Sequence, residues 1–543
     1  MRCPACVRRR GAPPRDPHQA RLALHGFLLL AILAIPAMLG TSARAGAPLR
    51  FAPDAPLVRA IDDTSAIAEP DRSDWNMNRW LVDAHGRTPL DDLLALHTPR
   101  PAQDINALDR VPACSWFRPR NGQRRLSTQE IARGNAPRAL IARGPLDVLA
   151  GRCDGREPFL LIRDAGGDRW ILEFDRPDHP LLATGAAIVA ARLLHAAGYH
   201  VLPARILTID PADLTLSDAA RAIGLRGGEG TLEQDALDRL LLRLADEGRV
   251  RVAASRLPAG ERKGGFRDRG TRSDDPNDRI PHEDRRALRG LLPLIAWLDH
   301  PGLRPSRTLD LYLSSGRYLR HYLVGLSATL GCLEHMRAEP GAASAESFAF
   351  DAAHWLPPDP FRPFTQMGHA DLYWGLSLLL SFDEAQIRAA VSAAEFPPEL
   401  EARVAHQLLM RWQTIGRAYL ERINGAGSFR VREEGAGRWR LLCDDLGVAA
   451  GLRNGEQQRF LLRYAYENGE DSGAQQVRGV SSASFDLTPF APLPSVPQDD
   501  PRRYGVATVT ALGPQGERRG AATRVHVYYP PGDPPRVVGI VRD

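Results

Sequence analysis

Residues 270–331 contain many acidic, basic and imidazole side chains, which could bind a polar ligand. Asp274, Asp275 and Asp278 lie in one loop, where their carboxylate oxygens would suit a hard cation. The loop is also rich in proline and asparagine, so the alternative is that these side chains cap its own turns. We favour the turn interpretation and predict no metal site.

Arginines flank this loop and could hold a carboxylate or phosphate through paired hydrogen bonds. Arg272 lies within it, and Arg286 follows on a segment with helical spacing. Local ionic contacts are ordinary on polar helix faces, so the alternative is an internal network. We favour that network, with Asp274, Asp275 and Glu283 as partners.

Two histidines and a further aspartate complete the set of candidate ligand-binding residues: His282, His300 and Asp310. His300 follows Asp299, and such a pair could act as a general base. Histidines in this setting more often satisfy a helix end or a buried backbone group, and we favour that role.

Other signatures of enzymes are missing from the sequence. It has no G-x-S-x-G, no Walker A motif, no H-E-x-x-H, and no G-x-G-x-x-G that opens a helix. These absences leave no cofactor to predict.

The elements that must position these residues alternate between strands and helices. Strands are predicted at residues 159–163 and 170–174 as a hairpin, and at 201–209, 250–256, 310–313 and 318–324. Helices are predicted at 184–197, 231–246, 286–299, 372–382, 383–394 and 398–424. Short alternating segments from residue 427 onward suggest antiparallel strands.

This order predicts an α+β protein with a two-lobed core and a C-terminal antiparallel β domain. The boundaries we expect are an N-terminal arm and packing segment at 46–145, an α+β N-lobe at 146–258, an α-rich C-lobe at 259–426, and a β-rich domain at 427–543.

Residues 1–45 resemble an export signal, with arginines before an apolar run and a small-residue ending at residues 43–45. An uncleaved membrane anchor is the alternative. This segment carries seven arginines and one aspartate, a net charge of +6 against +5 for the whole chain, so the remainder is close to −1. We therefore expect no nucleic-acid partner, and no membrane span after cleavage. Export allows the periplasm, the outer membrane or secretion.

Four cysteines lie beyond this segment, and an exported chain permits disulfides. We favour a Cys114–Cys153 bridge, with separate buried thiols at these positions and at Cys332 and Cys443 as the alternative. The chain has one lysine, Lys263, which we expect to be solvated.

Residues 105–425 resemble a family of exported bacterial proteins of poorly defined function, whose core is distantly similar to HipA-type and phosphoinositide-kinase-type atypical kinases. The resemblance rests on short sequence motifs, which include Ile171-Leu-Glu-Phe-Asp175, Gly270-Thr-Arg-Ser-Asp-Asp-Pro-Asn-Asp278, Trp297-Leu-Asp-His300, Arg320-His-Tyr-Leu323 and Ile415-Gly-Arg-Ala-Tyr-Leu420. The resemblance implies the kinase-like arrangement of two lobes.

A kinase-like site needs a cation for the phosphates, an orienting acid and side chains that bind metal. The resemblance implies Lys at Glu173, Glu at Ala187, Asp at Gly302, Asn at Arg307, and Asp-Phe-Gly starting at Gly325. This sequence departs at all five positions. The resemblance therefore implies a pseudokinase.

Our interpretation is an exported kinase-like scaffold without metal-dependent phosphoryl transfer, which binds an unknown envelope or extracellular protein. One alternative is an active phosphotransferase or nucleotide-binding protein that uses Arg272 or Arg307 as phosphate clamps. Another is a structural component of the envelope.

Overall fold

A computed structural model describes residues 50–51, 61, 63–87, 100–138, 140–155, 157–224, 228–331, 352–435, 437–478, 482–493 and 495–543. The predicted signal segment and Cys332 lie outside these residues. The chain divides into two compact units, Met1–Arg50 and Phe51–Asp543. All helices and strands that the structure describes belong to the second unit.

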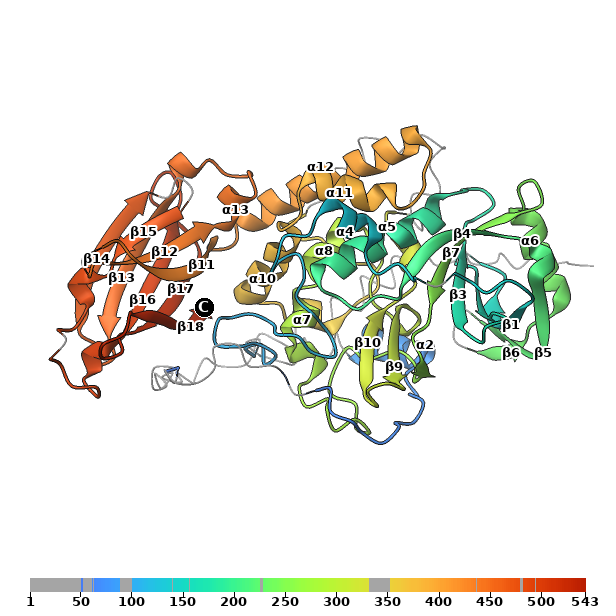
Figure 1. The fold of residues 1–543 in the computed structure, drawn as a ribbon, viewed down its shortest axis with the longest axis horizontal. Helices are drawn as coiled ribbons and strands as arrows, with labels where there is room; N and C mark the ends of the chain where they lie inside the picture. The colour runs from blue at the N-terminus through green and yellow to red at the C-terminus, as the bar shows by residue number, and fades with distance from the viewer. Residues whose placement is uncertain are drawn as a thin grey trace, which may run out of the picture. The chain divides into compact units, whose positions relative to one another are not determined.

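A seven-stranded mixed sheet occupies the region expected to form the N-lobe (Figure 1). Its order is β4 (Ala204–Ile209), β7 (Val250–Arg256), β3 (Arg169–Phe174), β2 (Phe159–Arg163), β1 (Leu146–Arg152), β5 (Leu214–Ile223) and β6 (Glu229–Thr231). β1 and β5 run parallel, and the other pairs are antiparallel. The predicted hairpin of β2 and β3 is confirmed.

Helix α6 (Gln234–Leu244) lies against this sheet in Figure 1. Its leucines at 237, 240 and 241 are buried in one hydrophobic cluster with Trp170, Leu172 and Val252. The leucine face predicted from helical spacing is therefore the face that packs.

Helix α5 (Leu182–Ala197) is almost wholly buried and joins the main core. Both the backbone N–H and the hydroxyl of Thr184 donate to the Asp175 carboxylate at 2.8 Å, which caps the first turn. The helix ends at Gly198 (φ 129°), where a Cβ would lie 2.3 Å from the Phe117 ring. Its alanines let neighbouring elements approach closely.

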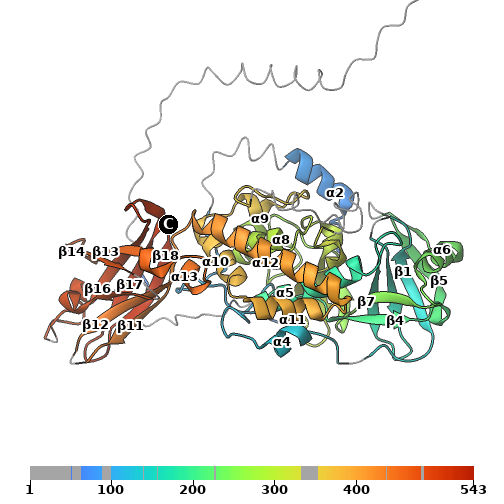
Figure 2. The ribbon, with the colours of Figure 1, turned by 90° about the horizontal axis from the view of Figure 1, so that it is seen from above.

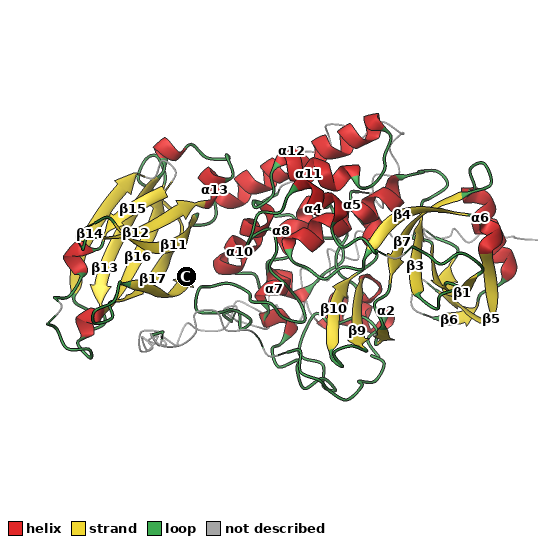
Figure 3. Ribbon diagram, viewed as in Figure 1, coloured by secondary structure: helices red, strands yellow, loops and turns green. Residues whose placement is uncertain are grey.

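A second, three-stranded antiparallel sheet follows, in the order β10 (Leu319–Leu323), β9 (Thr308–Leu313) and β8 (Gly260–Arg262). The helices are α7 (Arg286–Arg289), α8 (Leu292–Trp297), α9 (Arg362–Thr365), α10 (His369–Leu379), α11 (Glu384–Ser392) and α12 (Pro398–Leu420). Figure 2 shows α12 and α11 near α5, and Figure 3 shows the helices concentrated in this region.

The continuous helix predicted at 286–299 is wrong, because the structure breaks it into α7 and α8 at Gly290 and Leu291. A Cβ at Gly290 would lie 2.4 Å from the Trp374 ring, so this close packing of α7 and α10 requires glycine. Pro293 then lies in the first turn of α8, and inside a longer helix it would remove a backbone hydrogen bond.

The remaining strands form two antiparallel sheets. One has the order β11 (Ala426–Glu433), β12 (Trp439–Asp445) and β15 (Ser482–Asp486). The other has the order β14 (Asp471–Arg478), β13 (Arg459–Tyr466), β16 (Tyr504–Leu512), β17 (Arg518–Tyr528) and β18 (Arg536–Arg542). Leu441, Phe460 and Val525 belong to one shared hydrophobic cluster.

These sheets and helices give a mixed α/β protein, consistent with the expected α+β class. The prediction of a Cys114–Cys153 disulfide is wrong, because both cysteines are free thiols. Cys114 lies in the main core and Cys153 packs against the cluster of the seven-stranded sheet. Burial raises the pKa of Cys114 to about 12 and of Cys153 to about 11. Across the described segments, no helix is long and apolar enough to cross a membrane.

Candidate functional site

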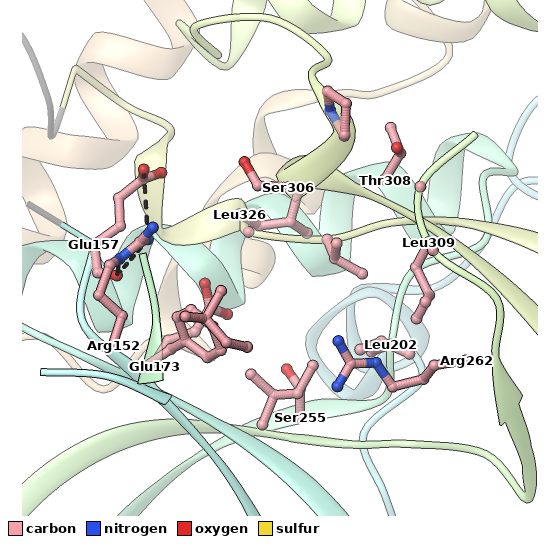
Figure 4. Close-up of a pocket in the computed structure, with 18 of the residues that line it drawn as sticks. Arg152, Glu157, Glu173, Leu202, Ser255, Arg262, Ser306, Thr308, Leu309 and Leu326 are labelled. Carbon is pink, nitrogen blue, oxygen red and sulfur yellow. Dashed lines mark hydrogen bonds and ion pairs between the residues drawn. The ribbon is translucent and has the colours of Figure 1, made fainter. Parts of the chain in front are cut away.

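A cavity of about 300 Å³ lies between the seven-stranded sheet, α5 and the three-stranded sheet (Figure 4). Its apolar lining includes Ile171, Leu202, Leu309 and Leu326. Its charged lining consists of Arg72, Arg152, Glu157, Glu173, Glu229 and Arg262. The space is large enough for a small organic molecule.

Three of the five positions at which the sequence departs from the kinase pattern line this cavity, and the other two lie next to them. Glu173 on β3, Ala187 on α5 and Gly325 line it directly. Arg307 is buried beside it, with its Cγ 3.3 Å from a Cβ built at Gly325. Gly302 lies behind Arg307, whose Nη1 approaches the Gly302 carbonyl at 3.5 Å. Residues far apart in sequence therefore meet around one space.

Glu173 makes a hydrogen bond across this space to the short 3-10 turn η5 (Leu326–Ala328). The Ser327 hydroxyl donates to Glu173 Oε1 at 2.6 Å, and the Ser327 N–H approaches the same oxygen at 3.4 Å. Burial raises the pKa of Glu173, and the hydrogen bonds from Ser327 oppose that rise. The two positions assigned by the resemblance to a phosphate-binding cation and to the Asp-Phe-Gly segment are thus bonded to each other.

Ser327→Ala is expected to lower the free energy of unfolding by about 1–3 kcal/mol, because it leaves the buried Glu173 carboxyl without this donor. The double variant Glu173→Met/Ser327→Ala replaces both polar partners and should recover much of the loss. Urea denaturation measures both. A double variant less stable than Ser327→Ala would contradict the assignment of this pair.

Arg307 is held by two carboxylates. It forms an ion pair with Asp359, and its Nη2 lies 3.1 Å from Glu157 Oε1. Burial opposes ionisation of Glu157, but the Arg307 and Arg304 charges outweigh it and lower the Glu157 pKa. The Arg307 guanidinium is therefore neutralised inside the protein.

The candidate ligand-binding residues do not line this cavity. Five of them, Arg272, Asp274, Asp278, His282 and Asp310, lie in one internal network. Asp278 is the centre of that network. It accepts from His282 Nε2 at 2.8 Å, from Arg285 Nη2 at 2.7 Å and from the Arg272 N–H at 2.6 Å.

The network continues through Asp310 and an aromatic stack. Asp310 pairs with Arg272 at 3.1 Å and with His321 at 2.7 Å. The Trp116 ring stacks on His321 at 3.6 Å between centroids, and Arg285 lies over its ring. The ionic network favoured from the sequence is present, and Arg272 pairs with Asp274 at 2.8 Å as expected. Asp310 and Asp278 take the roles expected of Asp275 and Glu283.

Asp275 and Arg286 lie elsewhere. Asp275 Oδ1 accepts from the Asn277 N–H at 2.9 Å, which is the turn-capping role favoured for the loop. Arg286 forms ion pairs with Asp109 and, at 3.0 Å, with Asp371. Asp109 also pairs with Arg542 of β18 at 3.0 Å.

His300 is buried, and its Nδ1 accepts from the Gly302 N–H at 3.0 Å. This is the backbone-satisfying role favoured from the sequence. Burial, followed by the charges of Arg307 and Arg304, lowers the pKa of His300 well below its ordinary value. The neutral imidazole is the form that the folded protein accommodates.

The depressed His300 pKa predicts acid sensitivity with a definite sign. Below about pH 6.5 the unfolded chain binds a proton at this histidine that the folded protein does not. The free energy of unfolding therefore decreases by about 1.4 kcal/mol for each unit by which the pH is lowered. Between pH 6.5 and 5 the wild type should lose roughly 2 kcal/mol more than His300→Gln. Urea denaturation at each pH checks this. The exposed His406→Gln should retain the wild-type slope, and an equal slope in His300→Gln would contradict the prediction.

Lys263 is buried rather than solvated. Its Nζ lies 2.6 Å from Glu69 Oε1, and it does not line the cavity. The loop that carries it folds back on the three-stranded sheet, since the Lys263 N–H donates to the Asp310 carbonyl at 2.8 Å. In the described parts of the chain, no cluster of three or more His, Cys, Asp or Glu side chains could hold a metal ion.

No protein-family model and no curated protein matches this sequence. Among solved structures it is similar to the crystal structure of the Golgi casein kinase, with 9% identity, coverage of 67% of this chain and 96% of that chain, and a TM-score of 0.29. It is also similar to the crystal structure of the Golgi casein kinase with Mn/ADP bound, with 11% identity, coverage of 67% and 93%, and a TM-score of 0.27. Both likenesses are weak, and nothing about the chemistry of this chain follows from them.

Three residues of the site were not singled out by the sequence: Ser327, Glu157 and Arg262. Ser327 stands within the segment that replaces Asp-Phe-Gly, so its position carried a usable signal. Glu157 and Arg262 lie in turns and short strands without a motif. Their roles depend on which distant segments pack together.

Proposed function

We propose that this protein is an exported, kinase-like binding protein that does not carry out metal-dependent phosphoryl transfer. The proposal rests on the sequence resemblance and on the arrangement around the cavity. The observation that carries it is the Glu173–Ser327 hydrogen bond at 2.6 Å. An acidic side chain stands where that chemistry requires a cation, and it is bonded to Ser327, within the segment that replaces Asp-Phe-Gly.

The fit of the other positions supports the same conclusion. Ala187 offers no carboxylate to orient a cation, and Gly325 has no ligand atom. A triphosphate entering the cavity would meet Glu157, Glu173 and Glu229. Three guanidiniums line the same cavity, so the charged lining offers a polyanion no net positive charge.

The alternative, in which Arg272 or Arg307 binds the phosphates of a nucleotide, is disfavoured because both arginines already pair with carboxylates inside the protein. Arg307 is nearly fully buried and pairs with Glu157 and Asp359. Arg272 pairs with Asp274 and Asp310 and does not line the cavity. Either guanidinium would have to abandon internal carboxylates before it could bind a phosphate, and leaving those charges unpaired is costly.

The character of residues 1–45 supports the proposal of export, which would place the binding role in the envelope or outside the cell. The cavity and the antiparallel sheets of residues 426–542 are the two surfaces proposed for binding. A pull-down from envelope extract with the purified protein would identify an envelope partner.

The test of inactivity is a thermal-shift measurement with ATP and GTP, each with and without Mg²⁺ or Mn²⁺. We expect no metal-dependent rise in Tm. The variant Ala187→Leu, which adds bulk to the cavity from α5, serves as a control for where any nucleotide binds. A metal-dependent rise of several degrees in the wild type that is lost in Ala187→Leu would overturn the proposal.

A further inference from the structure

Arg262 presents a cation to the cavity. It lies on β8, lines the cavity, and directs its guanidinium into it near Ser255 and Leu202 in Figure 4. Among the described residues, none donates to, accepts from or forms an ion pair with this guanidinium. A half-buried arginine without a carboxylate partner is uncommon, because burying an unpaired charge is costly.

The surroundings of Arg262 add to its positive potential. Burial, followed by the charges of Arg72 and Arg169, lowers its pKa, while Glu229 opposes that effect. Glu229 itself is shared by Arg72 at 3.0 Å and Arg221 at 2.6 Å. The Glu229 carboxylate is therefore already neutralised by other arginines, and an arginine remains protonated in proteins. Arg262 thus has no carboxylate of its own among the described residues.

The other two arginines that line the cavity are matched by carboxylates. Arg72 pairs with Glu229 at 3.0 Å, and Arg152 donates to the Glu157 carbonyl at 2.7 Å and lies 3.9 Å from its carboxylate. Glu173 is bonded to the neutral Ser327, and burial raises its pKa. Among the described residues, Arg262 is therefore the lining cation without a carboxylate partner, which suits a ligand with a single negative charge better than a polyphosphate.

Much of the remaining lining is apolar, beside polar residues such as Ser255, Ser306 and Thr308. Ile171, Leu202, Leu309 and Leu326 form its walls, and on α5 the small side chain of Ala187 leaves the space open. A volume of about 300 Å³ is at the lower end of the range of ligand pockets, roughly 300–1,000 Å³. An apolar body the size of a bicyclic ring fits that space.

We propose that this cavity binds a small organic monocarboxylate, with its apolar body against the leucine and alanine lining and its carboxylate paired with Arg262. The inference rests on the proposed binding function and names the ligand class of the same site. An arginine fork and a carboxylate match in shape, so the contact would be bidentate and specific for the anion.

The test uses 1-naphthoate and its neutral counterpart 1-naphthalenemethanol as probes, with isothermal titration calorimetry on the purified protein. The wild type should bind naphthoate at least about tenfold more tightly than the alcohol, since a charged hydrogen bond of this kind typically changes affinity by that factor or more. Arg262→Met, which keeps the bulk and removes the charge, should lose that preference and retain weak binding of the alcohol.

Two further variants locate the effect. Arg163→Met removes an exposed arginine of β2 that pairs with Asp147 and does not line the cavity, so it should keep the wild-type preference. Ala187→Leu should weaken both probes by occupying the space. The ligand-free Tm of each variant checks that it is folded.

Naphthoate that fails to bind, binds no better than the alcohol, or binds equally to Arg262→Met would overturn the monocarboxylate proposal. These outcomes are distinct from failure of the proposed function, because a metal-dependent Tm shift with ATP would contradict that function whatever naphthoate does. A protein without a nucleotide response and without a carboxylate preference would retain the first proposal and lose the second.

Discussion

Arg286→Met is expected to lower the free energy of unfolding by about 3–5 kcal/mol, which is typical of removing one partner from a buried ion pair. The Arg286 guanidinium pairs with Asp109 and Asp371, and all three side chains are buried. Its backbone N–H also donates to the buried Asp104. Without the guanidinium, two carboxylates would remain in the interior with less positive charge to balance them.

Urea denaturation of the purified protein measures this loss, and Arg388→Met is the matched control. Arg388 pairs with Glu384 at 2.7 Å on α11, but both side chains are more than half exposed, so the expected cost is about 0.5 kcal/mol or less. Equal losses in the two variants would show that burial does not set the strength of these pairs.

Gly302→Asp, which restores the residue implied by the kinase resemblance, should destabilise the protein by roughly 3–5 kcal/mol and give no nucleotide binding. Gly302 has φ 112°, a conformation that side chains rarely adopt. A Cβ there would also lie 2.4 Å from the Asp359 carbonyl oxygen and 3.1 Å from its Cα. Backbone atoms cannot move aside as a flexible side chain can.

Gly270→Asp separates the cost of the positive φ from the cost of the clash with Asp359. Gly270 has φ 65°, and a Cβ there would meet no atom within 4 Å, so only the backbone term remains. Its cost should be about 1–2 kcal/mol. Thermal and urea denaturation compare the two variants. If Gly302→Asp were as stable as Gly270→Asp, the contact with Asp359 would be unimportant.

Local patterns predicted much of the fold. The hairpin of β2 and β3, the helix α5 and strand β7 follow from alternation and helical spacing, and the structure confirms them. β5 was missed because most of its residues are polar or only partly buried, so it shows little alternation. The break between α7 and α8 depends on Trp374, which no local window contains.

The candidate site also has residues that the sequence could predict and residues that it could not. The five departures from the kinase pattern could be named from the sequence, because the resemblance assigns each of them a position along the chain. Their neighbours could not, because Ser327 reaches Glu173 across 154 positions and Arg307 reaches Glu157 across 150. The Cys114–Cys153 bridge failed for a related reason: spacing along the chain says little about which cluster receives each thiol.

The position of Asp109 has a consequence for the order in which the protein can fold. Its carboxylate pairs with Arg286 and with Arg542, and Arg542 also lies over the ring of Tyr373 in α10. A chain synthesised or translocated from its N-terminus must wait for both arginines before this charge is balanced. Contacts of such long sequence separation slow folding and prolong exposure of unfinished surfaces. The last strand, β18, is therefore expected to complete this part of the interior late in folding.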